Sequence, residues 1–230
     1  MMQSKEKEYV VVCGGAVKPA VSEIPKYVQN HKTYYIGVDG GSLKLIKAGY
    51  HLDYAVGDFD SVTEEEFQLI KDNATHIIKH PAQKDDTDME LALEIVQEEF
   101  PDLECFILGG IGEKKGRLDH MLANIWMVYQ PRFKQTVGRI KFIEKNHVFQ
   151  FFFPGEYEIS AEKMLPDYLS IITLTAVEQL SIQNAVYNLG TTDIGYPRAL
   201  ISNEFIDKNH PVKLSFKQGL VLVLRVNERK

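Results

Sequence analysis

The hydrophobic and polar positions of this 230-residue chain follow two different patterns, one after the other. In the first part, short apolar runs alternate with longer stretches whose apolar residues recur every three to four positions, which indicates alternating strands and helices. The strand candidates are 9–13, 33–38, 54–56, 76–79 and 105–108. The helix candidates are 22–29, 42–48, 63–71, 87–99 and 118–129. This order predicts a mostly parallel sheet with helices on both faces.

Local signals mark the ends of two of these helices. Thr87 and Glu90 have the spacing of a capping box, in which each side chain bonds the backbone N–H of the other, so a helix is expected to start at Thr87. Pro131 is expected to end the helix that begins at Leu118, because proline cannot donate the backbone hydrogen bond that a helix interior needs.

From Gly138 onward the pattern changes to short β-branched and aromatic runs separated by glycine and proline. These runs are 140–143, 148–153, 157–159, 169–175, 212–216 and 220–226. Short runs at this density are typical of an antiparallel sandwich or barrel with short turns. We therefore expect an α/β domain with a mostly parallel sheet over residues 1–135, followed by an all-β sandwich domain over residues 136–230.

Composition and charge narrow the function further. The chain has 26 Lys and Arg against 32 Asp and Glu, a formal charge of -6, which disfavours a nucleic-acid partner. No uncharged apolar run approaches the roughly 18 residues of a membrane span. Cys13 and Cys105 each lie inside an apolar run, as buried thiols do in a reducing compartment, so a cytoplasmic protein is expected.

Four of the predicted strands are followed by segments rich in acids or glycine. These segments are 39–41, 57–61, 84–88 and 109–112. Because ligands of a parallel sheet bind beyond the carboxyl ends of its strands, we expect the four segments to converge on one rim.

The acids of this rim predict a metal site. If the segment 57–61 stays extended, Asp58 and Asp60 point the same way and Phe59 turns into the fold. Two adjacent carboxylates stay ionised when a cation lies between them, and such hard oxygen ligands suit Mg²⁺; Asp39 and Asp88 would complete the set. The alternative is that these acids are ordinary turn and helix-start residues, but it must then hold separately at three segments.

Phosphate contacts are a second expectation at the same rim. Gly40 and Gly41 precede a helix, where bare backbone N–H groups can receive a phosphate. Lys114, Lys115 and Arg117 could bind phosphate oxygens, although a solvated loop explains the two lysines better than it explains Arg117. The chain has neither the dinucleotide-binding glycine fingerprint nor a G-x-x-x-x-G-K-[ST] loop.

Taken together, these segments resemble thiamine pyrophosphokinase. The resemblance rests on Asp-Gly-Gly at 39–41, Gly-Asp-Phe-Asp-Ser at 57–61, Lys-Asp-Asp-Thr-Asp at 84–88, Gly-Arg-Leu-Asp-His at 116–120 with Asn124, and Ile-Ser-Asn at 201–203. It implies an α/β catalytic domain that binds ATP and Mg²⁺, a β-sandwich domain that binds thiamine, and a homodimer with the active site at the subunit interface. The family transfers the pyrophosphoryl group of ATP to the thiamine hydroxyl and releases AMP.

The resemblance also implies roles for individual residues. The metal ligands would be Asp39, Asp58, Asp60 and Asp88, and the catalytic set would be Asp58, Asp60, Asp88 and Arg117. Residues expected to bind ATP or thiamine are Asp39, Gly40, Gly41, Lys84, Asp85, Arg117, Asp119, Ser202 and Asn203. Of these, Ser202 and Asn203 match the thiamine side. An acid not used on metal, such as Asp85, Asp86 or Asp119, could also favour the positive thiazolium ring.

Two rival functions stay open at this point. The run from Asp58 to Val62 looks like the nucleophile motif of haloacid dehalogenase-type phosphatases, in which phosphate is transferred to the first Asp. That motif belongs after the first strand of its domain, whereas here it follows the third. The second rival is a thiamine or nucleotide sensor without catalysis, which would keep Ser202 and Asn203 but lose the metal carboxylates.

Overall fold

The structure, a computed structural model, describes residues 8–15, 19–29, 31–110, 117–161 and 166–228. The chain divides into two compact units, Met1–Lys145 and Asn146–Lys230. Each unit has its own apolar core, so each is described by itself.

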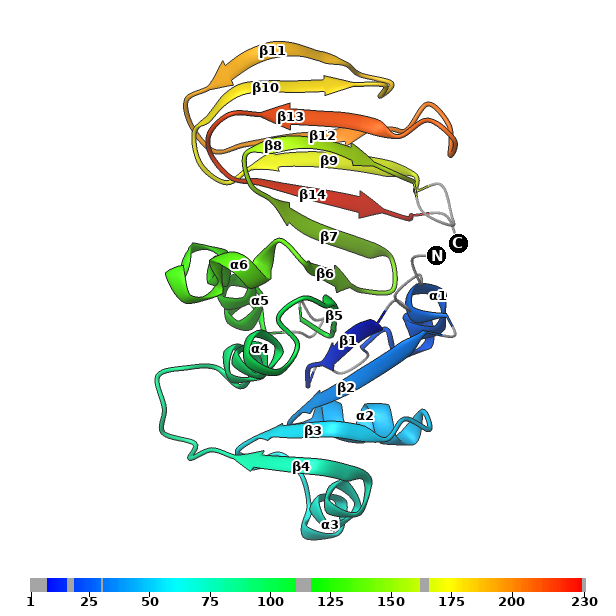
Figure 1. Ribbon diagram of the computed structural model, residues 1–230, viewed down its shortest axis with the longest axis vertical. Coiled ribbons are helices and arrows are strands. Elements are labelled where there is room, and N and C mark those ends of the chain that lie inside the picture. The colour runs from blue at the N-terminus through cyan, green and yellow to red at the C-terminus, as the bar shows by residue number, and fades with distance from the viewer. Residues whose placement is uncertain (1–7, 16–18, 30, 111–116, 162–165, 229–230) are drawn as a thin grey trace, which may run out of the picture. The chain divides into compact units, whose positions relative to one another are not determined.

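The first unit is built on a parallel sheet (Figure 1). Its strands are β1 (Glu8–Cys13), β2 (Lys32–Val38), β3 (Leu52–Gly57), β4 (Ala74–Lys79), β5 (Glu104–Leu108) and β6 (Ile140–Ile143). They lie in the order β6-β5-β1-β2-β3-β4, and every neighbouring pair is parallel. The first five confirm the predicted strands. The sixth, which the sequence pattern placed with the sandwich, pairs in parallel with β5, because a short apolar run looks the same in a buried parallel strand as in a sandwich strand.

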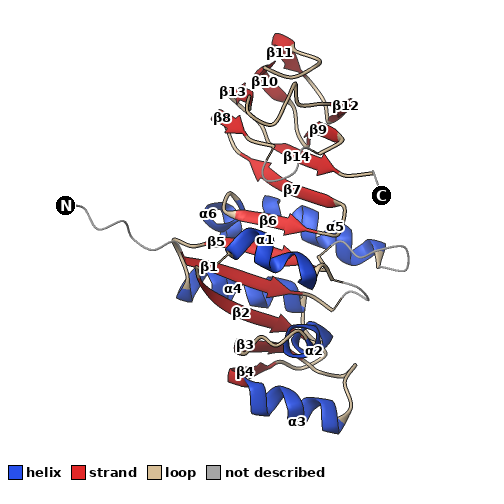
Figure 2. Ribbon diagram, turned by 90° about the vertical axis from the view of Figure 1, so that its right-hand side faces the viewer, coloured by secondary structure: helices blue, strands red, loops and turns tan. Residues whose placement is uncertain are grey.

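Helices cover both faces of this sheet (Figure 2). They are η1 (Val21–Glu23), α1 (Ile24–Val28), α2 (Gly40–Lys47), α3 (Glu64–Asn73), α4 (Asp88–Glu99), α5 (Leu118–Trp126), η2 (Met127–Tyr129), η3 (Pro131–Phe133) and α6 (Lys134–Val137). The capping box of Thr87 and Glu90 is present at the start of α4 as predicted, and Thr63 forms a second one at the start of α3. The predicted helix 118–129 ends its α-helical part at Trp126 and continues as the 3-10 turn η2.

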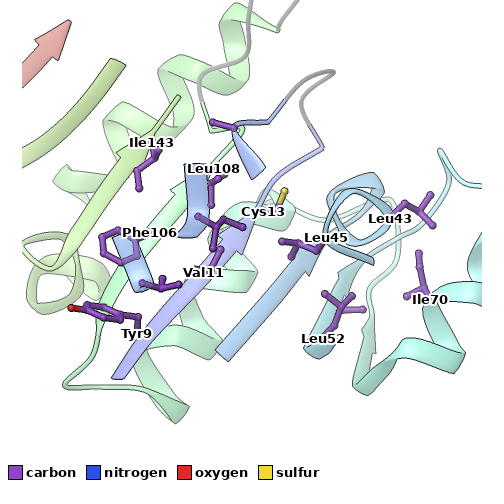
Figure 3. Close-up of a cluster of buried hydrophobic side chains, with 14 of the residues drawn as sticks. Tyr9, Val11, Cys13, Leu43, Leu45, Leu52, Ile70, Phe106, Leu108 and Ile143 are labelled. Atoms are coloured by element: carbon purple, nitrogen blue, oxygen red, sulfur yellow. The ribbon is translucent and has the colours of Figure 1, made fainter. Parts of the chain in front are cut away.

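The core of this unit explains why β1 reads as an uninterrupted apolar run. Tyr9, Val11 and Cys13 alternate along β1 toward one face, where Leu45 of α2 and Ile70 of α3 belong to the same cluster (Figure 3). From Val10 to Cys13 every residue of β1 is fully buried. A strand covered on both faces cannot alternate apolar with polar positions.

The connections between the strands place a ligand site. The chain adds β2, β3 and β4 on one side of β1 and then crosses over to place β5 on the other side. In such sheets the crevice lies where the strand order reverses, beyond the carboxyl ends of the strands. In this sheet the order reverses between β1 and β5. These two strands are joined at their carboxyl ends, because the Gly14 N–H donates to the Leu108 carbonyl at 2.8 Å.

The second unit is an antiparallel β-sandwich, as predicted. Its strands are β7 (His147–Phe152), β8 (Gly155–Ile159), β9 (Tyr168–Thr173), β10 (Val177–Gln183), β11 (Leu189–Ile194), β12 (Arg198–Asn203), β13 (Val212–Phe216) and β14 (Val221–Val226). One layer runs β12-β9-β14-β7 and the other β11-β10-β13-β8. The inner faces meet in one apolar cluster, in which Ile171 of β9 and Leu214 of β13 are completely buried.

None of the helices in the described part of the chain has the length and apolar character needed to cross a membrane.

Candidate active site

Asp39 lies at the carboxyl end of β2, directly before α2. Its backbone has a φ of 46°, which is uncommon for a residue with a side chain. The conformation is held from the neighbouring strand, because the Asp39 N–H donates to the Val56 carbonyl at 2.9 Å. The carboxylate does not cap α2. Instead its Oδ1 accepts a hydrogen bond from the Phe59 N–H at 3.3 Å, so Asp39 faces the segment that follows β3.

Two glycines make room for this arrangement. Gly57 ends β3 with a φ of 150°, and a Cβ at that position would lie 1.8 Å from Oδ1 of Asp39. Gly41 lies in the first turn of α2, and a Cβ there would lie 2.0 Å from the Cys13 carbonyl oxygen. Both backbones therefore approach their neighbours more closely than any residue with a side chain permits.

The segment after β3 turns where the sequence predicts an extended run. Phe59 has a φ of 58° and is 5% exposed, so its ring does point into the fold as expected. The turn brings the Asp60 N–H to Oδ1 of Asp58 at 3.1 Å. As a result Asp58 is half-buried, while Asp60 is exposed. The expectation that both carboxylates point the same way from an extended strand end is therefore wrong, because Phe59 takes the left-handed conformation.

The amino-terminal end of α4 supplies the next two groups. Thr87 caps the helix, and Asp88 is its first residue. The Lys84 ammonium lies 2.5 Å from Oδ1 of Asp88, and the two side chains are only 14% and 20% exposed. Asp85, between them in sequence, is exposed. A cation and an anion are thus held together at this helix start.

The carboxylates of Asp88 and Asp58 act electrostatically on Asp39. Burial, as the largest cause, and the neighbouring carboxylates of Asp88 and Asp58 together raise the pKa of Asp39 to about 7. The Asp88 side chain is close enough to share a hydrogen bond with Asp39. Over the ranges that the structure describes, however, no three His, Cys, Asp or Glu side chains form a group able to hold a metal ion by themselves. The predicted rim therefore brings together Asp39, Asp58 and Asp88, with Asp60 at its exposed side.

Arg117 and Asp119 lie at the start of α5 and pair with each other. The guanidinium Nη2 is 2.6 Å from Oδ2 of Asp119, and Nε donates to both carboxylate oxygens of Asp119. This pairing lowers the pKa of Asp119 to about 2. Both side chains are more than half exposed. The helix itself is anchored near the strand-order reversal, because the buried Asn124 side chain donates to the Gly110 carbonyl. The predicted contacts of Lys114 and Lys115 fall outside the described residues.

In the second unit, Ser202 and Asn203 end β12 and have different environments. The strand pairing of β12 with β9 shifts register between Leu200 and Asn203, and Ser202 takes a φ of 60° with its side chain exposed. The Asn203 side chain is buried, accepts hydrogen bonds from the N–H groups of Tyr187 and Glu204, and donates to the Tyr187 carbonyl. The Asn203 side chain thus holds this strand end in place, while the Ser202 side chain is exposed.

Sequence reasoning missed two residues that shape the site. The sequence shows Gly57 only as part of a turn. Its close approach to Asp39 depends on the distance between the ends of β2 and β3, which the sequence does not give. Arg132 was not singled out, although the acids that it contacts, Asp86, Glu90 and Glu94, are four residues apart on and just before α4. That spacing is visible in the sequence and signals an acidic stripe that needs a cation.

Comparison with known proteins agrees with this geometry. The family described as "Thiamin pyrophosphokinase, catalytic domain" matches residues 25–140, and "Thiamin pyrophosphokinase, vitamin B1 binding domain" matches residues 156–221. The thiamine pyrophosphokinase of Bacillus subtilis strain 168 is 35% identical over 217 residues, which are 94% of this chain and 96% of that protein. This chain belongs to the thiamin pyrophosphokinase family.

Solved structures of thiamin pyrophosphokinases share the fold over nearly their full length. A family protein from Enterococcus faecalis is 33% identical with a TM-score of 0.84, covering 96% of this chain and all of that one. The Bacillus subtilis structure is 34% identical with a TM-score of 0.82, covering 97% of this chain and all of that one. The yeast thiamin pyrophosphokinase, at 14% identity and a TM-score of 0.72, shares the fold alone.

Family membership also decides against the phosphatase rival. The Asp58–Asp60 segment follows β3, the third strand along the chain and two places from β1 in the sheet. A nucleophile of that class would follow the first strand instead. The motif in this chain is therefore the acidic segment of a thiamin pyrophosphokinase.

Proposed function

We propose that this chain transfers the pyrophosphoryl group of ATP to the hydroxyl of thiamine, giving thiamine diphosphate and AMP. The observation that carries the proposal is the position of Asp39, close enough to Asp88 and Asp58 for their charges to raise its pKa, in a chain that belongs to the thiamin pyrophosphokinase family. Carboxylates gathered in this way repel the triphosphate of ATP unless a cation screens them. A catalyst of this kind therefore needs a metal between the two sets of negative charges.

The residues fit Mg²⁺ by their chemistry. Mg²⁺ prefers oxygen ligands and is commonly held by one or two carboxylates together with waters and substrate phosphates. Burial and the carboxylates of Asp88 and Asp58 raise the pKa of Asp39, so these acids lie near enough to one another for one or two of them to supply the protein ligands. We assign Asp39, Asp58, Asp60 and Asp88 to this site. When bound, Mg²⁺ neutralises charge on the phosphates during transfer.

The chain's own residues then orient the substrates. Lys84 lies against Asp88 and supplies a positive charge for the phosphates, while the backbone N–H groups of Gly40 and Gly41 start α2 and can receive a phosphate oxygen. Arg117 and Asp119 are exposed at the start of α5, where an incoming nucleotide can exchange one partner of the pair for a phosphate.

The thiamine side is assigned to residues of the second unit and to one further acid. We assign Ser202 to contact with thiamine and Asn203 to holding its strand end, since the first is exposed and the second is buried in hydrogen bonds. We assign Asp85, which is exposed, to the electrostatic attraction of the thiazolium ring.

We also propose that the protein is a homodimer with the active site at the subunit interface, working in the cytoplasm. Large apolar side chains are exposed on α5 and η2, namely Leu118, Trp126 and Tyr129, and in the second unit, namely Val186, Tyr187, Ile201 and Ile206. A dimer interface that covers such side chains would remove them from water. Both cysteines are free and buried, as expected in a reducing compartment.

Metal binding and turnover in matched acid variants test the assignment of the carboxylates. We expect Asp60→Asn to fall below about one-tenth of the wild-type rate at saturating Mg²⁺, since a metal ligand is lost without a change in shape. Mn²⁺ bound in the presence of a non-hydrolysable ATP analogue, counted by electron paramagnetic resonance, should weaken in parallel. Asp72→Asn, an exposed acid of α3, is the control and should change neither. Wild-type-like turnover by Asp60→Asn would remove Asp60 from the metal site.

The oligomeric state is tested by light scattering at the concentration of the assay. We expect a dimer in the wild-type protein. Trp126→Glu, which puts a charge among the exposed apolar residues of α5, should give a monomer with little turnover. A fully active wild-type monomer would contradict a shared active site.

A further inference from the structure

Arg132 of η3 contacts three acids of another part of the chain. Its guanidinium binds Asp86 through two hydrogen bonds, Nη2 to Oδ1 at 2.5 Å and Nη1 to Oδ2 at 3.0 Å. Nη1 also donates to Oε1 of Glu94 at 2.7 Å, and Nη2 lies 3.6 Å from Oε1 of Glu90. Nε donates to the side-chain oxygen of Gln130 at 2.8 Å. One planar cation thus serves three carboxylates at once.

The three acids lie on one side of α4 and of the segment that leads into it. Residues four apart on a helix are neighbours, so Asp86, Glu90 and Glu94 form a stripe of like charges that would repel without a cation. Glu90 is also 7% exposed and completes the capping box, because its Oε2 accepts the Thr87 N–H at 2.7 Å. Burial of a carboxylate is tolerated when its oxygens are hydrogen-bonded, and Gln130 supplies a further bond to Oε1.

Two acids of this stripe flank Asp88 along the chain. Asp86 lies two residues before it and Glu90 two residues after it, and both are held by Arg132. Asp88 itself contacts Lys84 and influences Asp39 across the site. The direction in which the Asp88 carboxylate points therefore depends on a segment that is fixed on both sides by the same guanidinium.

The contact also joins two segments of the site to each other. Arg132 follows α5 and η2, so the stretch that begins with Arg117 ends in Arg132. The start of α4 and the end of the α5 stretch are thus held together by one side chain.

We propose that Arg132 is a positioning residue for the reaction: it holds the segment from Asp86 to Glu90 so that Asp88 keeps facing Asp39. The inference rests on the proposed role of Asp88, and Arg132 acts on the reaction through that residue alone. Displacement of a reacting group by about 1 Å can cost on the order of 100-fold in rate, so the loss of such a support should appear in kcat.

The test compares Arg132→Met with a control that breaks another contact of α4. Arg132→Met keeps the length of the side chain and removes the guanidinium. The control is Thr136→Val. In the wild-type protein, Oγ1 of Thr136 donates to Oε1 of Gln97 at 2.9 Å and joins α6 to the far end of α4, and the control removes this bond. Both variants remove a tie to the same helix, but only the first affects the end that carries Asp88.

Hydrogen exchange and steady-state kinetics are measured on the full chain. For Arg132→Met we expect the amides from Asp86 to Glu90 to exchange about tenfold faster without nucleotide or metal. We also expect kcat to fall about tenfold or more while KM for thiamine stays within about twofold. Thr136→Val should leave both exchange and kcat unchanged, and Arg132→Lys should restore part of kcat because it keeps the charge but not the planar fork.

Several outcomes would overturn the proposal. Unchanged exchange from Asp86 to Glu90 in Arg132→Met would show that Arg132 does not hold the segment, and an equal loss of kcat in Thr136→Val would reduce its role to general stability. If Arg132→Met does not fold, Asp86→Asn replaces it with the same expected increase in exchange and a smaller loss of kcat. Full turnover by Asp88→Asn would instead contradict the proposed site. Hydrogen exchange distinguishes this outcome from a failure of the proposal on Arg132, because it reports on the segment from Asp86 to Glu90 without depending on turnover.

Discussion

At the scale of single residues, the site depends on close approaches that glycine allows. Oδ1 of Asp39 can accept the Phe59 N–H because residue 57 is glycine. A Cβ at that position would occupy the space that Oδ1 of Asp39 takes. Phe59 in turn adopts a left-handed backbone and buries its ring, which directs Asp58 inward and leaves Asp60 exposed. The direction of each carboxylate is thus decided by the neighbour that fixes its backbone.

Gly57→Ala tests this dependence. A Cβ 1.8 Å from Asp39 Oδ1 must displace that carboxylate, and the positive φ adds strain. We expect a loss of about 1 to 3 kcal/mol of unfolding free energy, together with loss of turnover. The measurement is denaturant unfolding. Gly195→Ala is the control, since a Cβ there would meet nothing within 4 Å. If the Gly57→Ala protein were as stable and active as wild type, Asp39 would not be held in this way.

Asp39→Asn should make the metal-free protein more stable while it abolishes turnover. Burial and the carboxylates of Asp88 and Asp58 raise the pKa of Asp39 to about 7, well above its value in an unfolded chain. The folded state therefore favours the protonated acid, and wild-type stability falls as the pH rises from about 4 to 7. The neutral amide avoids this loss.

The gain in melting temperature from Asp39→Asn should thus be small at pH 5 and reach a few degrees at pH 8 without Mg²⁺. Thermal unfolding at both pH values measures it. A gain that is equal at the two pH values, or a loss at pH 8, would contradict the crowding of these three carboxylates.

The neighbourhood of Asp39, Asp58 and Asp88 could be predicted from the sequence, because the carboxyl ends of parallel strands meet at one edge. The exposure of Asp60 could not, since it depends on the left-handed turn at Phe59, which no residue type in the segment requires. The role of Asn203 was also beyond the sequence. Its amide is buried in bonds to Tyr187 and Glu204, and these partners are known only from the folded strand pairing.

At the scale of elements, the same capping device starts two helices that differ in function. Thr63 and Thr87 each accept the N–H of a glutamate three residues on, and each glutamate bonds back to the threonine backbone. The first box starts α3, whose acids are mostly exposed, and the second starts α4, whose first residue is Asp88. Both boxes follow from local sequence, which is why the start of α4 could be predicted to the residue. The strand β6 could not be assigned to its sheet, because its parallel pairing with β5 is a long-range contact.

The pair Thr63→Ala and Thr87→Ala separates stability from function. Loss of either cap should cost about 1 kcal/mol of unfolding free energy, since one hydrogen bond to the helix start is removed in each case. Turnover should survive in Thr63→Ala and fall in Thr87→Ala, because only the second cap fixes the start of the helix whose first residue is Asp88. Urea unfolding and initial rates measure the two quantities. Equal activity in both variants would argue that the position of Asp88 does not depend on the cap.

At the scale of the whole molecule, the chain combines two units with separate cores. The first presents acids, Lys84 and a helix start at the edge of a parallel sheet, and the second presents Ser202 at the end of a sandwich strand. The two family domains match these units, at residues 25–140 and 156–221. A catalyst that joins two substrates of opposite charge can use one unit for each, with the acids of the first screened by a cation.

The most direct test is ³¹P NMR of the purified protein with Mg-ATP, with and without thiamine. We predict that AMP and thiamine diphosphate appear together, in equal amounts, and only when both thiamine and Mg²⁺ are present. ADP or inorganic phosphate formed without thiamine would contradict pyrophosphoryl transfer and point to a phosphatase or ATPase that uses the same carboxylates. Thiamine binding without any turnover would contradict it as well, and would identify the chain as a sensor.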